Sequence, residues 1–184
     1  GTMPKLVKNL LLIVALLAAL GYLGFGYMKS QTKKASPEEG NTFQVGDVSI
    51  TVDYSRPGKK GRVIFGELVP YGKVWRTGAN EATTIEVSKD IRLGGQPLAA
   101  GKYTLWTIPQ ASSWTVILNS KSDAWGVTYG GEAQRDAAAD VVKVEVPVQQ
   151  LPTEVELFTI DVSTDPAALN LKGDLTGVSV PIER

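Results

Sequence analysis

The chain has 184 residues, a length that allows one domain of ordinary size. Lys and Arg together number 19, as do Asp and Glu, so the formal net charge is zero and the composition does not favour a nucleic-acid-binding protein. The absence of cysteine and histidine excludes disulfides, thiolate metal sites, Ser-His-Asp chemistry and histidine-ligated haem. Both methionines, Met3 and Met28, lie near the N-terminus, so we expect no cofactor and no metal site.

Residues 10–28 form a run without any charged or amide side chain and predict a transmembrane helix. At the helical rise of 1.5 Å per residue the run spans about 28 Å, close to the hydrocarbon thickness of a bilayer. The alternative is a cleaved signal peptide, with a small-x-small cleavage site at Ala19, Leu20 and Gly21. Because the apolar run continues past that site, we favour a retained single-pass anchor preceded by a short flank, residues 1–9.

The second half of this predicted helix is rich in small residues. Small side chains let another membrane helix approach closely, although glycine is also generally more common in membrane helices than in soluble ones. The candidate helix-docking residues are Ala18, Gly21, Gly24 and Gly26. The following residues, 29–42, lack apolar periodicity and contain both a proline and a glycine, so they are predicted to be a linker.

From residue 43 to the end, apolar and polar residues alternate in short segments that Gly- and Pro-rich turns separate. This pattern indicates an all-β fold, an antiparallel β-sandwich or barrel-like domain over 43–184. In the segment near residue 157 it places Val155, Leu157 and Thr159 on the inner face, and only 131–140 is compatible with a helical turn. The predicted strands lie at 48–54, 103–108, 114–118, 142–146, 155–159 and 178–180.

One segment gathers aromatic, charged and amide side chains between two glycines. A ring that stacks, a guanidinium that donates and a carboxylate that accepts can together bind a sugar or an anion. The alternative is a structural corner, in which Trp75 closes the end of the core, Arg76 pairs with Glu81, and Asn80 satisfies a turn. The candidate ligand or interface residues are Tyr71, Lys73, Trp75, Arg76, Asn80 and Glu81.

Two weaker constellations have simpler structural explanations. Glu67 and Glu81 can serve as the acid and base of a glycoside hydrolase, which needs two carboxyl groups about 5–10 Å apart, but surface positions explain them more simply. The tryptophans Trp106, Trp114 and Trp125 can form a stacking platform, although aromatic residues on sandwich strands usually belong to the core.

The string VPYGKVWRTGANEAT, which begins at Val69, is the most specific in the chain. Together with SRPGKKGRVIFGEL before it and with GGQPLAAGKYTLWTIP, WTVILN and AWG after it, it resembles the bacterial domain-of-unknown-function family 2911. The resemblance implies a compact β domain that is usually exported, and it implies no established activity, so no catalytic residue is carried over. The chain departs from the family pattern at Gly173, where members tend to have an aromatic residue, and in having a membrane helix in place of a short leader.

These observations favour a non-catalytic accessory or structural subunit of a bacterial membrane protein complex, with a photosynthetic or respiratory assembly as candidate host. We expect the N-terminus in the cytoplasm, the helix in the inner membrane among other membrane helices, and the β domain bracing the periplasmic face. The expected partners are other membrane-protein subunits and the lipid bilayer, not nucleic acid. The alternative is a membrane-tethered glycan- or anion-binding module that uses residues 75–81. A carboxylate-based hydrolase is a third interpretation.

Overall fold

The structure, a computed structural model, describes residues 4–121, 127 and 132–184. It consists of a helical unit that ends at Ala35 and a β unit that runs from Ser36 to Arg184, and each is described by itself. Trp125 and the AWG string at 124–126 lie outside the described residues.

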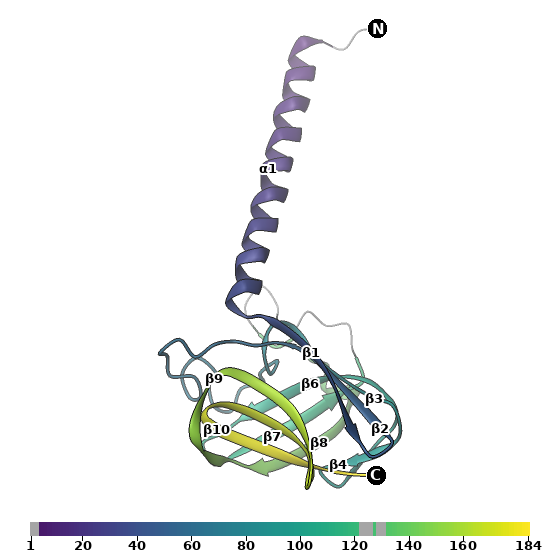
Figure 1. Ribbon diagram of the computed structural model, residues 1–184. Coiled ribbons are helices and arrows are strands. Elements are labelled where there is room, and N and C mark those ends of the chain that lie inside the picture. The colour runs from purple at the N-terminus through teal and green to yellow at the C-terminus, as the bar shows by residue number, and fades with distance from the viewer. Residues whose placement is uncertain (1–3, 122–126, 128–131) are drawn as a thin grey trace. The chain divides into compact units, whose positions relative to one another are not determined.

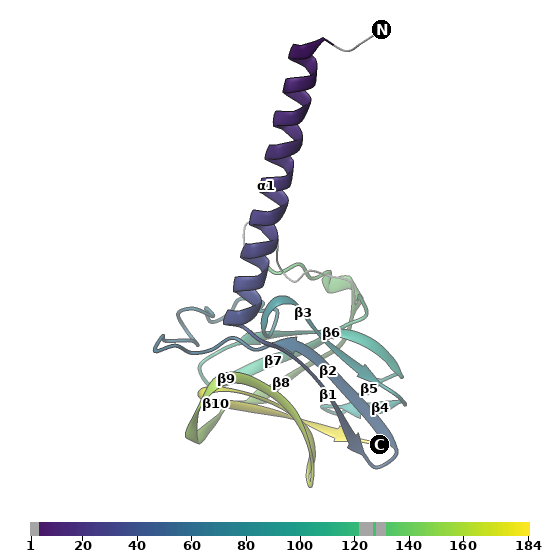
Figure 2. The ribbon, with the colours of Figure 1, turned by 45° about the horizontal axis from the view of Figure 1, so that its top comes forward.

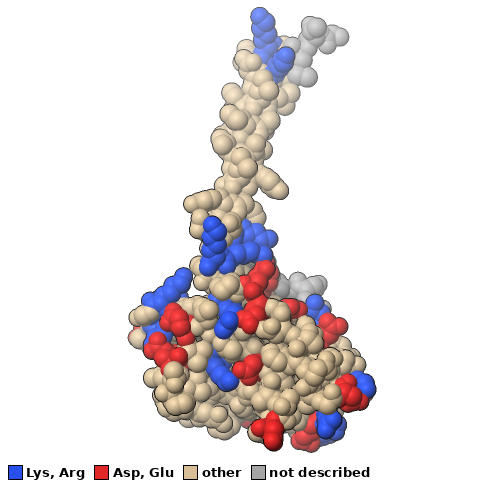
Figure 3. Space-filling model, viewed as in Figure 1, with Lys and Arg blue, Asp and Glu red and all other residues tan. Residues whose placement is uncertain are grey.

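The helical unit is one 31-residue helix, α1 (Lys5–Ala35), none of whose residues is buried. It is long and apolar enough to cross a membrane, a property that a membrane anchor shares with an N-terminal signal sequence. Its middle is a column of uncharged side chains with basic side chains at both ends (Figure 3). The predicted apolar span at 10–28 therefore lies within a longer helix.

The predicted linker at 29–42 is wrong, because α1 continues to Ala35 and the first strand already begins at Glu38. Residues 29–35 contain no glycine or proline, and the Thr32 hydroxyl donates to the Lys29 carbonyl oxygen at 2.9 Å, so nothing ends the helix there. Pro37 ends it, since the residue before a proline is disfavoured in the helical conformation. The first strand escaped prediction because it is an edge strand whose alternate residues are polar and exposed.

The β unit has two antiparallel sheets. The first has the order β1-β2-β3-β6-β7-β8, and the second β5-β4-β10-β9. Figures 1 and 2 show β9 and β10 as a long curved hairpin that lies across one face of the larger sheet. The strands are β1 (Glu38–Val45), β2 (Val48–Ser55), β3 (Ala79–Val87), β4 (Ile91–Leu93), β5 (Gln96–Leu98), β6 (Gly101–Pro109), β7 (Ser113–Asn119), β8 (Asp140–Pro147), β9 (Gln149–Thr164) and β10 (Ala167–Glu183). The predicted antiparallel β-sandwich is thereby confirmed, and the described residues of the segment at 131–140 contribute a 3₁₀ turn, η1 (Ala137–Ala139).

The main core lies between the two sheets, as the alternation of β2 predicts: Val48, Ile50, Val52 and Tyr54 all reach it. Trp114 belongs to the same core, whereas Trp106 belongs to a smaller cluster with Ile117 and Ala82. Both tryptophans are fully buried. Since neighbouring side chains of a strand point to opposite faces of its sheet, the two rings lie on opposite faces of the larger sheet. The core interpretation is confirmed for these two, and they cannot form one stacking platform.

The predicted inner face of β9 is wrong at its centre. Phe158, Ile160 and Val162 are the buried residues, while Leu157 and Thr159 are only partly buried. The register of β9 with β10 shifts on either side of Asp174, which has a left-handed φ of 51°. Such a bulge moves the side chains on one side of it to the other face of the sheet, so a single alternation cannot describe the whole strand.

Candidate functional site

A 23-residue excursion, residues 56–78, joins β2 to β3 and is hereafter called the 56–78 loop. Connections of this length without their own secondary structure are usually either functional or disordered. This one is held at both ends. The Trp75 N–H donates to the Thr107 carbonyl oxygen at 2.7 Å, and the Thr107 N–H donates back to the Trp75 carbonyl oxygen at 3.0 Å. At the other end the Lys59 N–H donates to the Glu156 carbonyl oxygen at 2.8 Å. The loop is therefore ordered by β6 and β9, two strands far away in the sequence.

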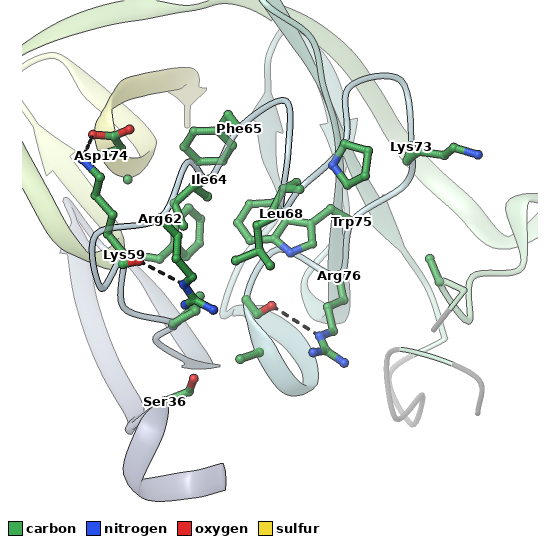
Figure 4. A pocket seen from close by; sticks show the side chains of 18 of the residues that line it. Ser36, Lys59, Arg62, Ile64, Phe65, Leu68, Lys73, Trp75, Arg76 and Asp174 are labelled. Carbon is green, nitrogen blue, oxygen red and sulfur yellow. Dashed lines mark hydrogen bonds and ion pairs between the residues drawn. The ribbon is translucent and has the colours of Figure 1, made fainter. Parts of the chain in front are cut away.

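A pocket of about 750 Å³ lies between this loop, the β9–β10 bulge and the residues Val127, Glu132 and Ala133. This volume is within the roughly 300–1,000 Å³ typical of ligand pockets. Most of its wall is apolar, with a few charged groups around it (Figure 4). The apolar wall includes Pro57, Ile64, Phe65, Leu68, Val74, Trp75 and Phe158. The charged residues that line it are Lys59, Arg62, Lys73, Arg76, Glu132, Glu156 and Asp174.

Aromatic rings form the innermost part of the wall. The Trp75 ring lies 4.9 Å from Phe158 and 6.0 Å from Phe65, centroid to centroid, with the planes at 66° and 74°. Phe65 in turn lies 4.9 Å from Trp114 in the main core. Such edge-to-face pairs are favourable arrangements. The pocket therefore opens directly onto one end of the hydrophobic core.

Gly173, in the bulge of β10, keeps this wall in place. A Cβ atom at this position would lie 3.2 Å from Cδ2 of Phe158 and 3.3 Å from Cζ of Phe65, which is tighter than ordinary contact. The two rings thus pack against bare backbone. The position that departs from the family pattern in the sequence is a buried part of the pocket wall.

The basic residues of the pocket have different surroundings. Lys59 pairs with Glu154 at 2.8 Å and Asp174 at 2.9 Å, and hydrogen bonds to these two carboxylates raise its pKa. Arg62 and Arg76 donate only to backbone carbonyl oxygens: Arg62 to those of Lys59 and Gly58, and Arg76 to that of Gly78 at 3.3 Å.

No carboxylate of the described residues lies within ion-pair distance, 4.0 Å, of either arginine. Burial lowers the pKa of Arg76, and the more distant charge of Glu81 only partly opposes this. In Figure 4 both guanidinium groups extend away from the aromatic rings toward the same side, whereas the Lys73 side chain points away from the pocket. Two cationic groups without a carboxylate partner therefore stand beside an apolar cavity.

The six candidate ligand residues do not form one site. Lys73, Trp75 and Arg76 line the pocket, but the other three do not. Tyr71 is 44% exposed and covers Gly66, where a Cβ would lie 2.8 Å from its ring. Asn80 and Glu81 lie on β3 outside the pocket wall.

The structural-corner alternative is realised only in part. Trp75 packs against the core as that alternative predicts. The predicted ion pair of Arg76 with Glu81 is absent from the described ion pairs. Asn80 adopts a left-handed φ of 57°, and its buried Nδ2 atom has no hydrogen-bond partner among the described residues.

Sequence reasoning missed Arg62, Phe65 and Phe158, and it identified Gly173 only as a departure from the family pattern. Arg62 and Phe65 carried a signal, since they stand in a long stretch without strand periodicity, but Phe158 and Gly173 are joined to it only by tertiary pairing. Glu67, like Glu81, lies outside the pocket wall, so the pocket does not bring this predicted pair of carboxylates together. In the described part of the chain, no group of three or more His, Cys, Asp or Glu side chains is placed to hold a metal ion.

The fold and pocket together define a β-sandwich protein that follows an apolar N-terminal helix. The family model described as "Protein of unknown function (DUF2911)" matches residues 36–182, so the chain belongs to this family. The match begins at the first residue after α1. No curated protein and no solved structure matches the chain.

Proposed function

We propose that this protein is a non-catalytic accessory subunit of a membrane protein complex in the bacterial inner membrane. In this proposal α1 is a retained anchor that docks among other membrane helices, with its N-terminus in the cytoplasm. The β domain braces the complex on the periplasmic side, and a photosynthetic or respiratory assembly is the candidate host.

The observation that carries the proposal is the open, small-residue side of α1. A Cβ atom added at Gly21 or Gly24 would meet nothing within 4 Å, apart from the helix's own backbone. Ala18 precedes them at the same spacing of three, and residues three apart are neighbours on a helix surface. A membrane helix that carries such a surface can bring its backbone close to that of a partner helix.

The test replaces the small residues without changing the charge or length of the helix. G21L/G24L fills the proposed docking side, and L16F/L23F adds bulk to the side of α1 that carries none of the candidate docking residues, as a control. We expect the first pair to abolish co-purification with partner subunits and the second to preserve it, with the β domain folded in both. Equal co-purification of the two variants would overturn the docking of α1.

The second candidate function is a membrane-tethered binding module, and the pocket favours it. About 750 Å³ of largely apolar space beside two arginines suits a ligand with an apolar body and an anionic group. The partly buried Trp75 ring makes edge-to-face contacts with Phe65, Phe158 and Trp114. A sugar ligand needs a free ring face to stack on, so these contacts favour an anion as the ligand. Isothermal titration with small organic anions against the wild type and Arg76→Ala tests this candidate, and binding that persists in the variant would contradict it.

A further inference from the structure

One edge of the pocket is tied by the chain to the end of α1. Ser36, which lines the pocket, directly follows Ala35, the last helical residue. From the end of the uncharged run at Met28, the helix rises about 10 Å before it reaches Ser36. The headgroup layer on each side of a bilayer is roughly 5–7 Å thick. If α1 spans a membrane, Ser36 stays within a few ångströms of the headgroups, whatever orientation the β domain adopts.

The 56–78 loop exposes apolar side chains that the rest of the β unit hides. Outside α1, five large hydrophobic side chains of the described residues are exposed, and three of them belong to this loop: Val63, Leu68 and Tyr71, at 56%, 52% and 44%. Leu68 also lines the pocket, as Ser36 does. Clustered exposed apolar side chains mark sites of interaction with proteins or membranes.

Charge distinguishes the loop from the remainder of its domain even more clearly. The 56–78 loop contains six basic residues and one acidic residue, whereas the rest of 36–184 contains eight basic and 18 acidic residues. Two of the six, Arg56 and Lys59, are paired with carboxylates. The side-chain nitrogens of the other four make no ion pair within 4.0 Å among the described residues: Lys60, Arg62, Lys73 and Arg76. An acidic domain thus presents one basic, partly apolar loop, a combination typical of surfaces that bind anionic lipids.

We propose that the 56–78 loop rests on the anionic lipid surface of the membrane that holds α1, and that the pocket binds one anionic phospholipid. Arg62 and Arg76 hold the phosphate, and the apolar part of the lipid lies against Leu68 and Trp75. The phosphate offsets the cost of partly burying Arg76, a cost that its lowered pKa expresses. The proposal requires α1 to be inserted as the proposed function states, but it does not require a partner subunit.

The experiment uses the full chain in lipid nanodiscs of phosphatidylcholine with a rising fraction of phosphatidylglycerol brominated on its acyl chains. Bromine quenches tryptophan fluorescence at short range. Comparison with the W75F variant identifies the part of the quenched fluorescence that comes from Trp75. The wild type should show saturable quenching of Trp75. R62Q/R76Q should raise the half-saturating lipid fraction by about 25-fold, because each cation near an anionic surface contributes about fivefold in affinity.

R92Q/K102Q removes the same charge from β4 and from the far end of β6 and should leave the titration unchanged. Equal half-saturation of the wild type and R62Q/R76Q would overturn the proposal. Inorganic phosphate, added to discs of pure phosphatidylcholine, should not alter Trp75 emission. A full response to phosphate alone would show that the pocket binds a free anion and not a lipid. That result would overturn the lipid proposal and leave the binding-module candidate intact. A missing lipid response, combined with loss of partner subunits from R62Q/R76Q, would assign the loop to a protein surface and leave the subunit proposal intact.

Discussion

Trp106 and Trp75 both interact with strand β6, yet they belong to regions built on different principles. Trp106 is part of β6, is fully buried, and donates its indole N–H to Thr104 at 2.9 Å. Trp75 pairs with β6 from the 56–78 loop, remains half-buried and lines a cavity. Trp106 thus lies in closely packed surroundings with its polar atom satisfied. The pocket region instead leaves space open and leaves two arginines without a carboxylate partner among the described residues. Regions that depart from regular packing in this way are where binding is expected.

The largest difference between the two regions should appear on truncation of their tryptophans. Trp106→Ala removes a fully buried ring and should lower the free energy of unfolding by about 4 kcal/mol. Trp75→Ala removes a partly buried ring beside an existing cavity and should cost roughly 2 kcal/mol. Urea denaturation followed by circular dichroism measures both. Equal losses would show that Trp75 is an ordinary core residue.

The mostly buried ion pair between Arg135 and Asp140 should give the next largest effect on stability. The two side chains are 12% and 15% exposed and lie 2.8 Å apart, and Asn119 also donates to Asp140 at 2.9 Å. Asp140→Asn should therefore cost about 3 kcal/mol of stability. Asp47→Asn, at the exposed pair with Lys89, is the control and should cause no measurable change.

Asp140 also predicts a dependence of stability on pH. Burial raises its pKa, but the hydrogen bonds from Arg135 and Asn119 and the positive charges of Arg135 and Lys143 together outweigh burial and leave the pKa below the ordinary 3.8. The contribution of Asp140 is thus fully present above pH 3.8 and is lost as the pH falls through the lower folded value. Acid unfolding curves of the wild type and Asp140→Asn should converge in that range. Curves that stay parallel through it would contradict this assignment.

Gly173→Ala should have a smaller effect, confined to the pocket wall. Its Cβ would press on the rings of Phe158 and Phe65, so we expect a loss of about 1 kcal/mol in stability and a narrower pocket. The melting temperature and the quenching of Trp75 by brominated lipid measure the two consequences. A variant with unchanged stability and unchanged quenching would show that the rings do not depend on bare backbone at this position.

Arg76→Ala should have the smallest effect on stability and a large effect on binding. Arg76 makes no ion pair within 4.0 Å in the described structure, so we expect its removal to change stability by less than about 0.5 kcal/mol. Loss of anion or lipid binding at an unchanged melting temperature is the predicted result. A loss of several kcal/mol would instead indicate that Arg76 braces the corner through Glu81.

The same contrast explains what the sequence could predict. The alternation in β2 predicted its core residues correctly because one regular strand buries one face. The edge strand β1 and the centre of β9 were missed, since exposure at an edge and a bulge at Asp174 both break that rule. Trp75 and Arg76 were identified by their chemistry, but their pocket partners Phe158 and Gly173 follow about 80 and 100 residues later. Only tertiary pairing brings them together.

The central claim, that the protein is a subunit of a membrane complex, is tested most directly in native membranes. Membranes are solubilised in mild detergent, separated on a native gel, and the band that contains this chain is analysed by mass spectrometry. The proposal predicts that the chain migrates in stoichiometric amounts within a large assembly of membrane proteins. Migration alone, as a 19.7 kDa species with bound detergent, would contradict it.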